Sequence, residues 1–207
     1  LSRRSRGLSI GINLNPNNAC NWACLYCQVP GLKRGSAPEV DIELLAQELR
    51  SLLESQRSGQ LADQFELKAE EATIRDIAIS GNGEPTSCPN FLAVTRIIGE
   101  MASEFDLLGH IKLVLITNGS LMERSEVQKG LRHWDELGGE AWFKLDRGTS
   151  EGMDQLNQSG IAIERVQRNL SICAGLLTTW IQTCVVTVDG APPSEDEVEC
   201  YLSLLKR

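Results

Sequence analysis

Short apolar runs alternate with amphipathic helical patterns along this sequence, and that alternation limits the possible folds more than any other feature. The clearest run, IKLVLIT from Ile111 to Thr117, is apolar almost without interruption. A run of this kind is typical of a parallel strand that is covered on both faces. Similar runs predict four further strands, at residues 9–14, 74–80, 142–146 and 178–188.

A helical pattern follows each of these strands. Between Asp41 and Glu54 the leucines recur on one helical face, with Asp41 available as the N-cap. Four more helices are expected, around residues 91–101, 123–137, 163–177 and 194–207. Five β-α units in strict alternation imply a parallel sheet, which right-handed crossovers curl into an open or closed barrel with helices outside. Sites in such folds lie at the carboxyl ends of the strands.

The composition indicates a globular chain. Its 207 residues are 42% hydrophobic and 23% charged, enough to bury one substantial core, so a single domain over residues 1–207 is expected. No apolar run approaches the roughly 18 residues of a membrane span, and the first residues lack the apolar stretch of a secretory signal. We therefore expect a cytoplasmic protein without a membrane partner.

Charge and cysteine content narrow the function classes. A net charge of −8 disfavours extended contact with nucleic acid, because phosphate binding needs an excess of Lys and Arg. Seven cysteines in a chain without a secretory signal argue against a disulfide framework. They favour reduced thiols, some of them metal ligands.

Three of the cysteines stand in one short loop after the first predicted strand, as Cys20-x3-Cys24-x2-Cys27. Ferredoxin cubanes take four cysteine ligands, so a three-cysteine loop leaves one iron free to bind a substrate or a cofactor. Structural zinc would need a fourth ligand, which makes a non-catalytic zinc module the alternative interpretation. The candidates for that fourth ligand are distant in the sequence: Cys88, His110 and His133.

The cysteine loop resembles the signature of the radical S-adenosylmethionine (radical SAM) enzymes, in which an aromatic residue, here Tyr26, directly precedes the third cysteine. The resemblance implies a [4Fe-4S] cluster on Cys20, Cys24 and Cys27, with the open iron chelated by S-adenosylmethionine. It implies reductive cleavage of that cofactor to a 5′-deoxyadenosyl radical. It also implies an electron donor of the flavodoxin or ferredoxin type. In such enzymes the cofactor supplies the hard chemistry, and the protein places it.

A second motif, Gly81-Asn82-Gly83-Glu84-Pro85-Thr86, closes the second predicted strand. Glycines let the backbone approach a ligand closely, and carbonyls with the Glu84 carboxylate suit a cationic ammonium group. Radical SAM enzymes carry a Gly-Gly-Glu-like loop here that binds the amino group of S-adenosylmethionine. The resemblance therefore assigns the cofactor to Gly81, Asn82, Gly83 and Glu84, although Asn82 stands where the family commonly has glycine. On its own, the motif would be a plain turn.

Polar residues follow the third and fourth predicted strands. Asn118 ends the third strand within Thr-Asn-Gly, and Lys144 and Asp146 lie on the fourth. In the family, polar residues at these strand ends hold the ribose hydroxyls and the carboxylate of S-adenosylmethionine, so the resemblance assigns all three to the cofactor. The alternatives are a turn residue at Asn118 and a surface pair of Asp146 with Arg147.

Several short runs together resemble the wybutosine-synthesis-related branch of the radical SAM Fe-S oxidoreductases, over residues from about 2 to 146. They are Ser-Arg-Arg followed by Gly-x-Ser-Ile-Gly-Ile-Asn-Leu, then Cys-Leu-Tyr-Cys-Gln, Gly-Glu-Pro-Thr and Thr-Asn-Gly-Ser. The resemblance implies a partial (β/α) barrel in an enzyme of oxidoreductase or transferase type. It suggests a tRNA base as substrate, with a protein as the other option, and leaves the substrate unidentified. Only five of the family's six β-α units are visible, so we expect a C-terminally incomplete domain, with a shortened barrel as the alternative.

Overall fold

The computed structural model describes residues 7–68 and 70–206; Ser2 to Arg6, which open the resemblance, lie outside them. A five-stranded sheet has the order β1-β4-β5-β6-β7, and every neighbouring pair is parallel. The prediction of a parallel α/β partial barrel is confirmed in its open form. The strands are β1 (Leu8–Ile12), β4 (Ile74–Ile79), β5 (Lys112–Thr117), β6 (Glu140–Lys144) and β7 (Thr178–Gln182).

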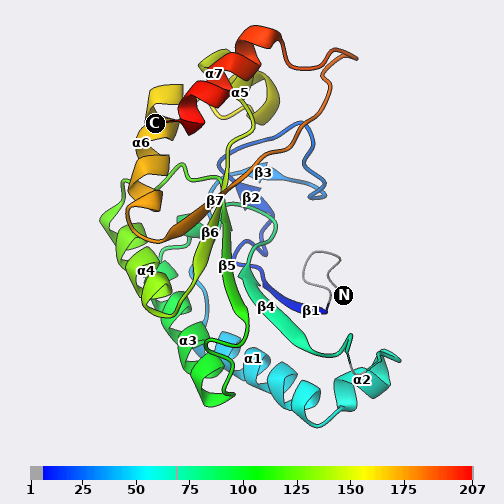
Figure 1. Ribbon diagram of the computed structural model, residues 1–207. Coiled ribbons are helices and arrows are strands. Elements are labelled where there is room, and N and C mark those ends of the chain that lie inside the picture. The colour runs from blue at the N-terminus through cyan, green and yellow to red at the C-terminus, as the bar shows by residue number, and fades with distance from the viewer. Residues whose placement is uncertain (1–6, 69, 207) are drawn as a thin grey trace.

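The long helices that connect the strands form a layer along one side of the sheet (Figure 1). Helix α1 begins after Asp41, whose carboxylate accepts a hydrogen bond from the N–H of Leu44 at 3.0 Å, as its capping pattern predicts. No helix in the described part of the chain is long and apolar enough to cross a membrane. The helices up to α6 are α1 (Ile42–Arg57), α2 (Gln60–Gln64), α3 (Phe91–Glu104), α4 (Ser125–Glu136), α5 (Ser150–Asn157) and α6 (Ile163–Ala174).

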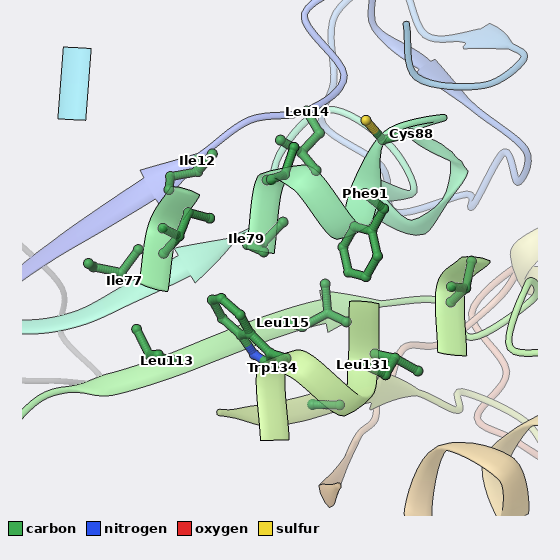
Figure 2. Close-up of a cluster of buried hydrophobic side chains, with 14 of the residues drawn as sticks. Ile12, Leu14, Ile77, Ile79, Cys88, Phe91, Leu113, Leu115, Leu131 and Trp134 are labelled. Atoms are coloured by element: carbon green, nitrogen blue, oxygen red, sulfur yellow. The ribbon is translucent and has the colours of Figure 1, made fainter. Parts of the chain in front are cut away.

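The main apolar core fills the space between the sheet and this helix layer. On the opposite face of the sheet, Ala78 and Val114 are also buried, at 3% and 1% exposure. Strand β5 is therefore covered on both faces, which explains its nearly continuous apolar sequence. Figure 2 shows the helix side of the core, where side chains from β4 and β5 meet those of α3 and α4: Ile77, Ile79, Leu113, Leu115, Phe91, Leu131 and Trp134.

The fifth strand is shorter than its sequence predicted. Strand β7 ends at Gln182 because its neighbour β6 ends at Lys144 and offers no further partner. Beyond that point the N–H of Cys184 donates to the Asp146 carboxylate at 2.7 Å instead of joining a strand. The expected continuation to residue 188 is wrong because side-chain hydrogen bonding replaces the ladder.

Two helices lie beyond one end of the sheet (Figure 1). Helix α7 (Glu195–Leu205) begins after Ser194, the cap that the sequence predicts. Helix α5, which the sequence analysis did not predict, is capped by the hydroxyl of Thr149. At eight residues, α5 is short for recognition from periodicity alone.

The reactivity of Cys173 in α6 measures how tightly the helix layer packs on β7. Its side chain is fully buried, and burial raises the pKa of the thiol to about 11. Because the thiolate is the reactive form, we expect iodoacetamide at pH 8 to modify the exposed Cys200 in the native protein and to spare Cys173. Peptide mass spectrometry measures both sites. After denaturation both should react, and equal native rates would contradict this packing.

Candidate metal and cofactor site

The three clustered cysteines lie in one loop after β1. Two short parallel strands, β2 (Ala19–Cys20) and β3 (Lys33–Arg34), pair and close the loop at its base. The N–H of Cys27 donates to the carbonyl of Cys24 at 2.9 Å, which makes a tight turn between these two residues. All three thiols are free, with Cys27 exposed and the others half-buried. The loop therefore presents three unpaired sulfur ligands.

The surroundings of Cys20 favour its neutral thiol while no cation is bound. Burial raises the pKa of Cys20, and the negative charges of Glu84, Cys24 and Cys27 add to the effect, against a lowering hydrogen bond from the backbone of Trp22. A bound metal reverses this preference, because thiolate is the ligand form.

The loop after β4, Gly81–Glu84, packs directly against the cysteine loop. A β-carbon added at Gly83 would lie 2.0 Å from the carbonyl oxygen of Ala19, so no larger residue fits there. The Asn82 amide donates to the side-chain oxygen of Asn18 at 2.7 Å. The glycine-loop backbone is thereby held beside the first cysteine.

The carboxylate of Glu84, which is 1% exposed, joins the glycine loop to the end of β5. Its Oε1 accepts from the N–H and hydroxyl of Thr86 at 3.0 and 2.5 Å and from the hydroxyl of Thr117 at 2.6 Å. Its Oε2 accepts from the N–H of Asn118 at 2.6 Å. Burial raises the pKa of Glu84, and these hydrogen bonds oppose the rise. Of the two carboxylate oxygens, only Oε2 can still accept a further hydrogen bond. The main role of Glu84 in this structure is therefore to hold the glycine loop in place. Its contact with an ammonium group stays a prediction.

The side chain of Asn118 connects β5 to the cysteine loop. Its Nδ2 donates to Oδ1 of Asn21 at 2.8 Å, and its Oδ1 accepts from the N–H and hydroxyl of Ser120 at 3.0 and 2.7 Å. The hydroxyl of Ser120 in turn accepts from Nδ2 of Asn21 at 2.6 Å. Asn118 therefore acts as a brace between two segments that are far apart in the sequence.

Tyr26 lies between Lys144 and Asp146. Nζ of Lys144 lies 4.9 Å from the centroid of the Tyr26 ring, a cation–π geometry. The Tyr26 hydroxyl donates to the Asp146 carboxylate, and burial together with that carboxylate raises the pKa of Tyr26 far above its usual value. Asp146 also accepts from Nδ2 of Asn157 at 2.7 Å. Asp146 thus fixes Tyr26, the aromatic residue of the cysteine loop, by accepting a hydrogen bond from its hydroxyl.

These segments surround a cavity of about 530 Å³. Trp22 and Gln182, to which the sequence analysis gave no binding role, line it as well. A larger cavity of about 680 Å³ between α5 and α7 is lined by none of the three cysteines. All predicted site residues except Asp146 line the cavity of about 530 Å³. They are Cys20, Cys24, Tyr26, Cys27, Gly81, Asn82, Gly83, Glu84, Asn118 and Lys144.

The proposed zinc ligands outside the loop lie elsewhere. The Cys88 thiol donates to Oδ1 of Asn90 at 3.1 Å, and Nδ1 of His133 lies 3.2 Å from Glu136 on α4. His110 precedes β5, at the amino end of that strand. Among the described residues, no three His, Cys, Asp or Glu side chains converge on the position of one metal ion. A cubane does not need such convergence, because its thiolates bind different irons.

Comparison with known proteins finds relatives that are longer than this chain. No protein-family model matches it. A UPF0026 protein of Helicobacter pylori strain ATCC 700392 / 26695 is 28% identical over 217 aligned positions, which cover 100% of this chain and 60% of that protein. A second, from strain J99, is 24% identical and covers 86% of this chain and 54% of its own length. The chain thus spans somewhat more than half of these curated relatives.

Solved structures share the arrangement of strands and helices. TYW1 with a lysine-pyruvate adduct bound has a TM-score of 0.58 at 18% identity, over 95% of this chain and 61% of TYW1. Native anSMEcpe with bound AdoMet and Kp18Cys peptide scores 0.54 at 18% identity, over 84% and 43%. The cobalamin-dependent S-adenosylmethionine radical enzyme OxsB scores 0.58 at 17% identity, over 95% and 26%. The fold is that of the radical SAM enzymes. The resemblance drawn from the cysteine loop is confirmed at this level.

The radical SAM fold of this chain includes one site element that the sequence analysis missed. The N–H groups of Ala23 and Leu25 in the cysteine loop donate to the carbonyls of Asn157 and Leu156, at 3.1 and 2.8 Å. Both carbonyls belong to the end of α5. Thr149, an N-cap residue that precedes the apolar Met153 and Leu156, was the sequence signal that could have revealed this helix.

Replacing Glu84 with Gln should destabilise the metal-free radical SAM fold by about 1–3 kcal/mol. The amide nitrogen of Gln would face the N–H of either Thr86 or Asn118, where the carboxylate now accepts from both. Urea unfolding followed by circular dichroism measures the loss. Glu104→Gln, at an exposed ion pair with Arg50, is the matched control and should change stability far less. Equal stability of both variants would contradict the role of Glu84 as a brace.

Proposed function

We propose that this chain is the core of a radical SAM enzyme, holding a [4Fe-4S] cluster on Cys20, Cys24 and Cys27 and S-adenosylmethionine beside it. One observation carries the proposal: three free thiols and a glycine loop line a single cavity, at the carboxyl ends of parallel strands. The likeness in fold to anSMEcpe, solved with bound AdoMet, and to OxsB, an S-adenosylmethionine radical enzyme, supports it.

The residues present fit both groups. Three thiolates satisfy three irons of a cubane and leave the fourth iron open to a cofactor. The cavity volume of about 530 Å³ falls within the range of small-molecule sites. Gln182 lines this cavity, and its buried side-chain oxygen is an acceptor without a hydrogen-bond partner among the described residues.

When bound, a reduced cluster would supply one electron to the sulfonium of S-adenosylmethionine, breaking its bond to the 5′ carbon and giving methionine and a 5′-deoxyadenosyl radical. The chain's own residues bind and orient. Gly83 allows the glycine loop to approach the carbonyl of Ala19 closely. Glu84 and Asn118 fix the loops that form the cavity wall. Trp22, at 3% exposure, excludes water behind the cysteines. Lys144 places a positive charge against the ring of Tyr26, where it suits a carboxylate of the cofactor.

The partners follow from the position of the site. Cys27 is exposed, which gives an electron donor of the flavodoxin or ferredoxin type a short path to the proposed cluster. The substrate is proposed to be a tRNA base, in line with the wybutosine-related resemblance and the TYW1 neighbour, with a protein as the second candidate. The net charge of −8 gives the hypothesis of a tRNA substrate no independent support.

Anaerobic reconstitution tests the function. We expect about four irons per chain and the formation of 5′-deoxyadenosine from S-adenosylmethionine when dithionite is added. Cys20→Ala, Cys24→Ala and Cys27→Ala should each lose both. Cys200→Ala, at an exposed position outside the cavity, is the control and should keep both.

Metal analysis separates this function from the zinc alternative. A colourless protein that retains one tightly bound zinc after anaerobic purification, and that takes up no iron, would overturn the proposal. Iron uptake without release of 5′-deoxyadenosine would leave the cluster in place and overturn the assignment of S-adenosylmethionine.

A further inference from the structure

The end of helix α5 holds the middle of the cysteine loop. The N–H groups of Ala23 and Leu25, which flank Cys24, donate to the carbonyls of Asn157 and Leu156 at 3.1 and 2.8 Å. The last carbonyls of a helix have no partner within the helix, so α5 satisfies them with the backbone of this loop. Cys24 is therefore fixed on both sides by one helix terminus.

The side chain of Asn157 reaches the sulfur of the same cysteine. It is fully buried, and its Nδ2 lies 3.3 Å from Sγ of Cys24 and 2.7 Å from Oδ2 of Asp146. Nδ2 also lies 3.4 Å from the hydroxyl oxygen of Tyr26, so the two N–H bonds of the amide have three acceptors within reach, of which Asp146 and Cys24 are the nearer two. The orientation of the amide follows from Asp146, because the opposite orientation would place the amide oxygen 2.7 Å from a carboxylate oxygen.

The three cysteine sulfurs differ in their surroundings. Among the described hydrogen bonds, Sγ of Cys24 is the one sulfur of the three that accepts from a side-chain N–H. The Cys20 thiol instead faces the side-chain oxygen of Asn21 at 3.9 Å. Hydrogen bonds to a sulfur ligand draw negative charge from it and raise the reduction potential of an iron-sulfur cluster.

We propose that Asn157 is a positioning residue that anchors Cys24 and raises the reduction potential of the cluster bound there. The potential part rests on the proposed function, since it requires the cluster. The anchoring part belongs to the protein itself. A higher potential makes the cluster easier to reduce by a physiological electron donor, so Asn157 would set how strong a donor the enzyme needs.

A matched pair of variants tests the proposal. Asn169 in α6 is also fully buried, donates through Nδ2 to a backbone carbonyl, that of Gly119, at 2.7 Å, and leaves its Oδ1 without a partner among the described residues. It contacts none of the cysteines through these bonds. Asn157→Ala and Asn169→Ala therefore remove similar buried amides, with and without the sulfur contact.

The first measurement uses the metal-free protein. Hydrogen exchange of the peptide that spans residues 20–28 should be faster in Asn157→Ala than in the wild type, and unchanged in Asn169→Ala. Asn157→Ser, which keeps a short donor, provides a second variant if Asn157→Ala fails to fold. Equal exchange in wild type and both Asn157 variants overturns the anchoring role, whether or not a cluster can be loaded.

The second measurement uses the reconstituted protein without S-adenosylmethionine. In a redox titration monitored by electron paramagnetic resonance, the ratio of reduced to oxidised cluster at a fixed potential should fall several-fold in Asn157→Ala. A tenfold fall corresponds to about 59 mV for a one-electron couple. Asn169→Ala should match the wild type. An unshifted Asn157→Ala overturns the tuning role, whereas a wild type that takes up no iron overturns the proposed function instead.

Discussion

The buried carboxylate of Glu84 is the interaction on which the site depends. Glu84 accepts hydrogen bonds from its own loop, through Thr86, and from the end of the next strand, through Thr117 and Asn118. Adjacent parallel strands bring their carboxyl ends to one edge of the sheet, but they do not fix the loops that follow. Removing a charge from water is costly, and these hydrogen bonds offset the cost only if both loops keep their places. The carboxylate therefore makes two loops into one rigid wall.

The opposite wall, the cysteine loop, is held by contacts of another kind. It has little regular structure of its own, because β2 and β3 contain two residues each. Its support comes from the helix terminus of α5, from the brace between Asn21 and Asn118, and from the close approach of Gly83. Each contact joins the loop to a different β-α unit. The positions of the three thiols therefore depend on several β-α units being in place together.

Local signals predicted most of the fold. The apolar run of β5 and the cap at Asp41 are determined by nearby residues, and the structure places both elements as expected. The cysteine spacing and the glycine motif likewise identified residues that line one cavity. The end of β7 could not be predicted, because it depends on where β6 stops. Asn157 and Gln182 escaped notice for a similar reason, since their roles arise from contacts with segments distant in the sequence.

The contact between Cys24 and Asn157 spans 133 residues of the sequence. A ribosome therefore releases the cysteine loop long before it releases the helix that supports it. Until α5 has been synthesised and has docked, the loop lacks the hydrogen bonds that hold Cys24, and ordering a free loop costs conformational entropy. The cysteine loop therefore becomes ordered late in the synthesis of the chain. A nascent or shortened chain that stops before α5 presents its cysteines without the hydrogen bonds from Asn157 and Leu156.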